Sequence, residues 1–188
     1  SSIEQDCLSR AVLATPNAIV NGTLGTPPTA LLTYLGARTK MNQFLAPPDA
    51  RTMLVDSNSS AYIVDSLKGL FQDSSQIKEQ YREGIMGRTA GFDWVEGQLN
   101  PFTTVGNKVA GLTVSAAPAD GASTLVIAGT AAADTFKKGQ VFTIAGVYAV
   151  NPETRQSTGS LQQFVVTADA TAAGATTSVA VYPAFHFA

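Results

Sequence analysis

The residues best suited to nucleophilic catalysis are the single cysteine, Cys7, and the single histidine, His186. A thiol needs a neighbouring base to form the reactive thiolate, and an imidazole is a common base. His186, however, stands between two phenylalanines and is the third residue from the end of the sequence. We therefore expect Cys7 to be a small buried residue on a helix face and His186 to have no role in catalysis. One cysteine also excludes an internal disulfide and a cysteine-clustered zinc site.

Two carboxylate pairs, Asp93 with Glu96 and Asp56 with Asp65, are the residues that a hydrolase could use. Asp93 lies between aromatic residues in a segment that reads as an alternating strand, so its side chain is expected to point away from them. That position is typical of a solvated face rather than a catalytic cleft. We therefore predict that the chain is not an enzyme.

Neither nucleotides nor nucleic acids have a recognisable site. The segment Gly22-Thr23-Leu24-Gly25 lacks the Lys-Ser or Lys-Thr ending of a phosphate-binding loop, and no Gly-x-Gly-x-x-Gly follows a strand. The doublet Lys137-Lys138 is more typical of a solvated turn, because affinity for nucleic acid requires many neutralised phosphates. We predict no cofactor and no metal.

The elements that position these residues differ between the two halves of the chain. In the first half, helical spacing of apolar residues predicts helices over 1–13, from 26 to about 44, and from 57–59 to beyond 67. Thr26 before two prolines, and the Ser-Asn-Ser at 57–59, are the expected N-caps. Residues 52–55 and 84–95 are predicted to be extended, whereas 77–82 is either a short helix or a loop. The residues expected on buried faces are Ile3, Cys7, Leu8, Val12, Leu31, Leu32, Leu35, Ile63, Val64, Leu67, Leu70, Phe71, Phe92 and Trp94.

In the second half, five apolar runs predict strands at 112–115, 124–127, 141–147, 163–167 and 178–182. Turn-forming pairs separate them, at 120–121, 138–139, 151–152, 158–159 and 173–174. Short strands at this spacing predict a small antiparallel barrel or sandwich. The fold class expected for the whole chain is therefore α+β.

Composition supports a division into two parts. Only 14% of the 188 residues are charged, with 12 basic and 14 acidic side chains, and few of these lie beyond Lys108. We place a domain boundary at 100–104. No apolar run approaches the roughly 18–20 residues that cross a bilayer, and no secretory signal opens the sequence. We therefore expect no membrane association.

Two stretches resemble the centre of major coat proteins of tailed bacteriophages, of the short-tailed podovirus type with an inserted domain. One runs through Tyr81-Arg82-Glu83-Gly84 to Ala90-Gly91-Phe92-Asp93. The other, 138–147, is similar to the Lys-Gly-Asp, Phe-x-Ile-x-Gly-Val run of the insertion domain, with Gln140 where an acid is usual.

The resemblance implies an axial-domain portion of the tailed-phage and herpesvirus capsid fold, followed by an insertion domain that is a six-stranded antiparallel β-barrel in relatives. Residues 1–13 would end the spine helix of the peripheral domain, 14–102 would form the axial portion, and 103–188 the insertion domain. The chain would then be a central fragment of a coat protein.

The function so implied is that of a structural subunit which self-assembles into the icosahedral shell around the DNA genome. Its partners would be copies of itself, a scaffolding protein and a portal, with no sequence-specific recognition of DNA. The implied location is the virion, and the host bacterial cytoplasm before assembly. Assembly depends on many weak symmetric contacts, which a weakly charged chain without a reactive site can supply.

Two further readings concern surface residues. The segment 151–159, with Glu153 and Arg155, is either a loop that reaches another capsomer or an ordinary solvated hairpin loop. In the alternative function, a carbohydrate-binding or adhesive β-module, Trp94, Tyr148 and Tyr182 would offer stacking faces, although aromatics on alternating strands are more often core residues.

Overall fold

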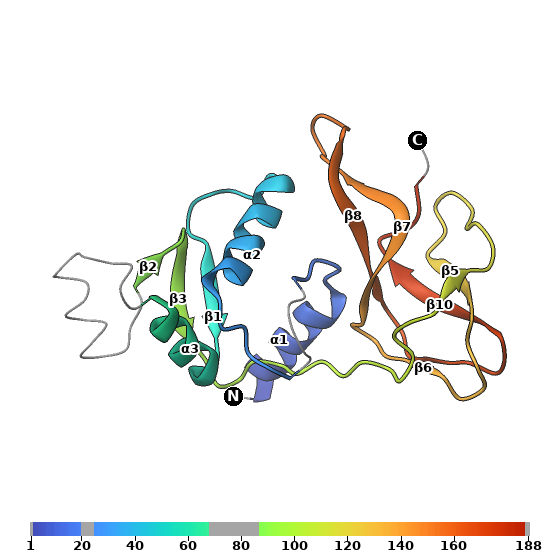
Figure 1. Ribbon diagram of the computed structural model, residues 1–188, viewed down its shortest axis with the longest axis horizontal. Helices are drawn as coiled ribbons and strands as arrows, with labels where there is room; N and C mark the ends of the chain where they lie inside the picture. Colours follow the sequence, from blue (N-terminus) through green and yellow to red (C-terminus); the bar gives the residue numbers. More distant parts are fainter. Residues whose placement is uncertain (1, 20–24, 68–86, 187–188) are drawn as a thin grey trace. The chain divides into compact units, whose positions relative to one another are not determined.

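The structure, a computed structural model, describes residues 2–19, 25–67 and 87–186 (Figure 1). Contacts divide the chain into two compact units. One, the β unit, comprises Ser1–Ala18, Pro101–Ala149 and Gly159–Ala188, and the other, the mixed unit, comprises Ile19–Asn100 and Val150–Thr158. The change at Asn100 falls within the segment where the composition shifts. Helices and strands are both present, so the α+β class is confirmed at this level.

In its described residues the mixed unit contains two helices, α2 (Leu31–Gln43) and α3 (Ser57–Leu67), and both predicted caps are wrong. The first helix begins at Leu31 rather than in the Thr-Pro-Pro segment, and its N-cap Ala30 makes no side-chain cap hydrogen bond. The second is capped by Asp56, whose main-chain carbonyl accepts from Ser60 N–H at 2.9 Å and whose carboxylate accepts from Ser59 N–H at 3.4 Å. Aspartate competes well with serine at this position because its carboxylate also favours the positive end of the helix dipole.

A three-stranded sheet, in the order β1-β3-β2, accompanies these helices. The strands are β1 (Thr52–Val55), β2 (Arg88–Thr89) and β3 (Phe92–Glu96). The first and third run parallel, whereas β2 and β3 form a hairpin that pairs Thr89 with Phe92. Ala90 and Gly91 join them with φ values of 58° and 86°, the left-handed conformation that a tight two-residue hairpin turn requires. The predicted extended segment 84–95 is thus a hairpin from residue 88 onward.

The core of the mixed unit lies between these strands and helices. Phe92 and Trp94 are both buried, so their predicted shared face is confirmed, and Tyr34 meets Trp94 edge-on with ring centroids 5.4 Å apart. By contrast, Leu32 was expected to be buried and is 78% exposed, because Tyr34 occupies the inner side of α2. Predicted core positions Leu70 and Phe71, and the segment 77–82, lie outside the described residues. The buried cluster is Tyr34, Val55, Ile63, Phe92 and Trp94, with Leu31, Met41, Met53 and Val64 packed against it.

Arg51 is a buried cation that the sequence pattern does not reveal. Its guanidinium donates hydrogen bonds to Pro47 O at 2.8 Å, to Asn42 Oδ1 at 2.9 Å and to Ala46 O. All three acceptors lie at or just beyond the C-terminal end of α2. Its own carbonyl accepts from Asp93 N–H at 2.8 Å. Carbonyl groups at a helix C-terminus carry partial negative charge, so they stabilise a guanidinium there. Arg51 therefore links α2 to the sheet.

The β unit consists of helix α1 (Ser2–Ala14) and seven strands. All five predicted strands are confirmed, and β7 and β8 are longer than expected. Two short strands, β6 and β9, were not predicted. The strands are β4 (Thr113–Val114), β5 (Thr124–Ala128), β6 (Thr135–Phe136), β7 (Val141–Val150), β8 (Ser157–Val166), β9 (Ala170–Thr171) and β10 (Thr176–Tyr182).

Five of these strands form one sheet, in the order β4-β5-β10-β8-β7, and β6 pairs with β9 in a separate antiparallel ribbon. Within this sheet β4 pairs antiparallel with β5, β5 with β10, and β10 with β8. Among the described residues, β4 and β7 are the two ends of this sheet, so the strands do not close into one hydrogen-bonded barrel. The expected turn at 158–159 is wrong, because Gly159 lies within β8 with φ 76°.

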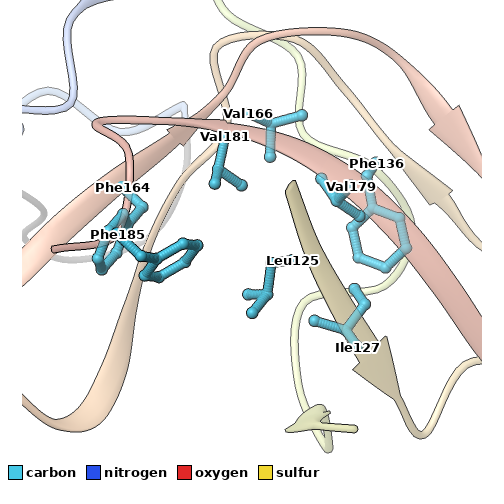
Figure 2. Packing of buried hydrophobic residues seen from close by; sticks show 8 residues of the cluster. All are labelled: Leu125, Ile127, Phe136, Phe164, Val166, Val179, Val181 and Phe185. Carbon is cyan, nitrogen blue, oxygen red and sulfur yellow. The ribbon is translucent and has the colours of Figure 1, made fainter. Parts of the chain in front are cut away.

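The inner face of the sheet encloses an apolar core (Figure 2). Phe164 lies between two other rings, with centroids 4.8 Å from Phe185 and 5.8 Å from Phe142. Leu125 and Val181 are almost completely buried. Removing these apolar side chains from water stabilises the β unit. The cluster is Leu125, Ile127, Phe136, Phe164, Val166, Val179, Val181 and Phe185.

The other face of β8 contacts the N-terminal segment. Val165 points away from the core cluster yet is fully buried, and two positions before it Gln163 hydrogen-bonds Ala18. The side chain of Leu13 lies so close to Gly139 that a Cβ there would overlap it. The stripe predicted to be buried on α1 is wrong at three of its four positions, since Ile3 is 78% exposed and Cys7 and Val12 are also exposed. These contacts lie at or beyond the last turn of α1, which leaves its first turns uncovered.

Candidate functional site

The two residues considered for nucleophilic catalysis have different neighbours. His186 Nδ1 lies 3.4 Å from Asp120 Oδ1, and its side chain is 76% exposed. Cys7 lies on α1, exposed instead of buried as expected. The structure records no contact that would let the imidazole activate the thiol, so the two residues give no dyad among the described contacts.

Both carboxylate pairs are separated by the geometry of their elements. Asp93 and Glu96 are three residues apart on β3, so they point to opposite faces of the sheet. Asp93 faces Arg88 at 3.9 Å, and Glu96 accepts a hydrogen bond from Ser57 at 3.3 Å. Asp56 caps the start of α3, and Asp65 lies nine residues along, about 13 Å at 1.5 Å per residue.

Hydrogen bonds at the start of α3 perturb the pKa of Asp56. Its side-chain hydrogen bond with Ser59 holds the pKa below the ordinary value of 3.8, and main-chain donors at the start of α3 act in the same direction. Tyr34 contacts the same serine, and burial raises the pKa of its phenol. Both shifts make the groups less reactive toward protons near neutral pH, which fits a helix cap and not an acid-base pair.

The basic doublet is anchored in a turn. Lys137 Nζ lies 2.9 Å from Asp169, and Lys138 N–H donates to the same carboxylate at 2.8 Å. These two hydrogen bonds hold the pKa of Asp169 below its ordinary value of 3.8, and the bond from Lys138 N–H has the larger effect. The carboxylate thus joins the turn before β7 to the turn after β8. This arrangement favours the solvated-turn reading of the doublet.

The loop with Glu153 and Arg155 is shorter than predicted, since β7 ends at Val150 and β8 starts at Ser157. Asn151 organises it: its Oδ1 accepts from Glu153 N–H at 2.9 Å and Thr154 N–H at 3.1 Å. Arg155 adopts φ 56°. Both charged side chains are exposed. A preformed tip with two exposed charges is compatible with either reading of this segment, so the intersubunit role stays a prediction.

The three aromatic residues proposed as a stacking surface are divided between the units. Trp94 is 9% exposed and its Nε1 donates to Thr89 O at 2.9 Å, so it is a core residue of the mixed unit. Tyr148 on β7 and Tyr182 on β10 are 51% and 55% exposed. Of the three residues, Tyr148 and Tyr182 therefore have rings that could stack on a ligand, and Trp94 does not.

An apolar cavity of about 530 Å³ lies in the β unit, and no pattern in the sequence indicates it. Its walls come from 109–114, from 140–145 at the start of β7, and from core residues of β5, β8 and β10. Gln140 is one of its polar residues, and its Oε1 accepts from Gly106 N–H at 3.2 Å. The cavity therefore lies between the segment that leads into β4 and the beginning of β7, where the sheet does not close.

Across the described residues there is no group of three or more His, Cys, Asp and Glu side chains that could hold a metal ion. The helices of the described segments include none long and apolar enough to cross a membrane. The chain matches no protein-family model, and no curated protein matches it.

Proposed function

We propose that this chain is the central part of a structural subunit of an icosahedral phage capsid, and that the complete subunit self-assembles into the shell that encloses the DNA genome. The motif resemblance is the origin of this proposal. In this proposal residues 1–13 end the spine helix of the peripheral domain, residues 14–102 form the axial portion and residues 103–188 form the insertion domain, within the tailed-phage and herpesvirus capsid fold.

The observation that carries the proposal is the order of the elements along the chain from α2 onward. An α+β unit, in which Phe92 and Trp94 form the core, is followed at Pro101 by strands that build an antiparallel sheet of their own. This is the arrangement expected of an axial portion that carries an inserted β domain. A subunit of this kind needs extended surfaces for repeated contacts and no reactive centre.

The chemistry of the described charges agrees with a structural role. Asp56 caps a helix, Arg51 binds the end of another, and Asp169 joins two turns. Each of these side chains has its hydrogen-bonding capacity engaged within its own unit. The partners proposed for the full subunit are other copies of itself, a scaffolding protein and a portal, and its place is the virion.

The test is electron microscopy of the complete parent coding sequence, expressed together with its neighbouring genes so that a scaffolding protein is supplied. Closed shells of uniform diameter are the expected result. Well-folded protein that forms no shells under these conditions would contradict the proposal.

A second variant set examines the hairpin loop in the same expression system. Reversing both charges, Glu153→Lys with Arg155→Glu, is expected to prevent closure of shells while the thermal unfolding of the chain stays unchanged. The matched control is reversal of the exposed pair on α1, Asp6→Arg with Arg10→Asp, an i,i+4 pair at 2.9 Å. Normal assembly of the loop variant would reject the intersubunit role of this loop.

A carbohydrate-binding or adhesive β-module remains the second candidate, and the exposure of Tyr148 and Tyr182 is the observation in its favour. Exposed tyrosines offer an apolar ring face together with a polar hydroxyl, as sugar-binding surfaces do.

A further inference from the structure

Strand β7 is a long, uncharged edge strand of the five-stranded sheet. It is the last strand of the five-stranded sheet within the described residues, and it spans ten residues, Val141–Val150. The strand contains no proline and no charged residue. Natural edge strands generally carry charges or prolines, or are very short, because these features stop another strand from pairing with them. A long uncharged edge is therefore a surface to which a further strand can add.

Strand β4, at the opposite edge of the same sheet, does not pair with β7. Strand β4, at the other end, has only two residues, and the cavity of about 530 Å³ separates 109–114 from 140–145. Among the described strands, none other than β8 is a neighbour of β7 in this sheet. A strand that added to β7 would lie beside residues 142–145, which line this cavity.

The faces of β7 change phase in its middle. Phe142, Ile144 and Val147 pack against the core cluster, whereas Thr143 and Tyr148 are exposed. The core-facing residues Phe142 and Ile144 are thus two positions apart, as in a regular strand. Ile144 and the next core-facing residue, Val147, are three positions apart. Gly146, with φ 84°, lies at this break, as the extra residue of a β-bulge does.

This phase change makes the strand self-complementary in one register. Consider an antiparallel pair of identical strands with the two-fold axis between Ala145 and Gly146. Two residues that lie opposite each other then have residue numbers that add up to 291. Core-facing Ile144 then meets core-facing Val147, and exposed Thr143 meets exposed Tyr148. A regular strand paired in this register would set inward residues opposite outward ones, since side chains alternate with a period of two.

Charges beyond the two ends of the strand fit the same register. Glu153 follows β7 in the hairpin loop, and Lys138 precedes it in the turn, and both side chains are exposed. The residue numbers of Lys138 and Glu153 also add up to 291. In this register, Glu153 of each copy therefore lies opposite Lys138 of the other copy. Two opposite-charge pairs related by the two-fold axis favour a second copy of this chain over an unrelated strand.

We propose that two copies of this chain associate through antiparallel pairing of their β7 edges, about a two-fold axis at Ala145 and Gly146, with Thr143 of each copy opposite Tyr148 of the other. The two sheets become one continuous sheet across the axis. The main-chain hydrogen bonds supply the affinity, and the bulge at Gly146 supplies the register.

Disulfide trapping tests the register in the whole 188-residue chain. In a Cys7→Ser background, a variant with both Thr143→Cys and Tyr148→Cys is expected to form a covalent dimer on mild oxidation, because directly opposed residues have Cα atoms about 4.5–5.5 Å apart. Each single variant is the matched control. It places its two cysteines five residues out of register, about 17 Å apart along the strand, and should stay monomeric on a non-reducing gel.

Sedimentation velocity over a range of concentrations tests the interface without cysteines. Ala145→Lys sets two like charges beside the axis and is expected to raise the dimer dissociation constant about tenfold or more, or about 1.4 kcal/mol. Thr124→Lys, an exposed position on β5 three strands away from β7, is the control and should leave it unchanged. Glu153→Lys should weaken the dimer, and adding Lys138→Glu should restore it.

A chain that is monomeric at every concentration and gives no covalent dimer would overturn the proposal. So would a dimer that Ala145→Lys does not weaken in a variant whose circular dichroism shows a normal fold. The outcome is independent of shell formation, because a β7-paired dimer can exist whether or not the parent protein assembles into capsids.

Discussion

The side-chain amide of Gln163 hydrogen-bonds both main-chain groups of Ala18. Its Oε1 accepts from the Ala18 N–H at 2.9 Å, and its Nε2 donates to the Ala18 carbonyl at 2.8 Å, across 145 positions of sequence. An amide side chain can mimic a neighbouring strand in this way, because it presents one donor and one acceptor side by side. Gln163 therefore ties the segment after α1 to strand β8.

Replacing this glutamine should release the N-terminal segment. Gln163→Leu is expected to lower the free energy of unfolding by about 1–2 kcal/mol. Two hydrogen bonds are lost, and the part-buried main-chain groups of Ala18 lose these partners. Urea unfolding measures the stability, and limited proteolysis at 15–19 should become faster. Gln156→Leu, at an exposed position of the hairpin loop, is the control and should cost about 0.5 kcal/mol or less. Equal effects of the two variants would contradict this role.

The contact of Gly139 with Leu13 gives a second prediction for the same unit. Gly139→Ala is expected to be more destabilising than Gly121→Ala, although both glycines have similar positive φ values of 87° and 77°. Each alanine incurs a conformational cost of about 1–2 kcal/mol, but only the Cβ at residue 139 overlaps a neighbouring side chain. Thermal unfolding of both variants measures the difference, and Leu13→Ala should reduce it. No difference between the two glycines would place Leu13 elsewhere in solution.

Arg51 is expected to be a main determinant of stability in the mixed unit. Arg51→Met should lower the free energy of unfolding by about 2–3 kcal/mol, because a buried group loses charge-assisted hydrogen bonds and leaves carbonyl oxygens unpaired. Arg51→Lys should recover part of the loss, since the ammonium keeps the charge without the planar fork. Trp94, the single tryptophan, provides a fluorescence signal for this unit.

The matched control for Arg51 is Arg88→Met. Arg88 is exposed and lies 3.9 Å from Asp93, so its loss should cost under about 1 kcal/mol. If Arg51→Met were no more harmful than Arg88→Met, the buried contacts with the end of α2 would not be present in solution.

Asp56 makes the stability of α3 depend on pH in the acid range. Its pKa is lower in the folded chain than its ordinary value of 3.8. The contribution is therefore complete above that value and is lost as the pH falls through the lower folded pKa. Asp56→Asn keeps a capping side chain without the titration. The stability of the native chain should approach that of this variant as the pH falls below 3.8, and a constant difference would exclude the linkage.

The two candidate functions make opposite predictions on a glycan array. A capsid subunit is expected to bind no glycan. Binding that Tyr148→Ala and Tyr182→Ala abolish, while Trp94→Phe leaves it unchanged, would instead establish the carbohydrate-binding alternative. Trp94 serves as the control because its ring is buried.

Local patterns in the sequence determined most of the elements. The strand at 52–55 was predicted at the bounds of β1, and the alternation of Phe92 and Trp94 predicted their common buried face. Five apolar runs between glycine-containing or proline-containing turns predicted the main strands of the β unit. These features follow from periodicity and turn chemistry, which act within a few residues and can therefore be seen in one sequence.

Tertiary structure alone decided which neighbours these elements have. Nothing near Arg51 in the sequence shows that it is buried, because its acceptors become available only when α2 ends beside β1. Ile3 and Leu32 fit a helical stripe and are exposed, since burial depends on whether another element covers that face. The pairing of β6 with β9 and the open edge of β7 depend on contacts between distant segments. A periodic pattern specifies which face of an element is apolar, but the packing of the whole chain determines what that face contacts.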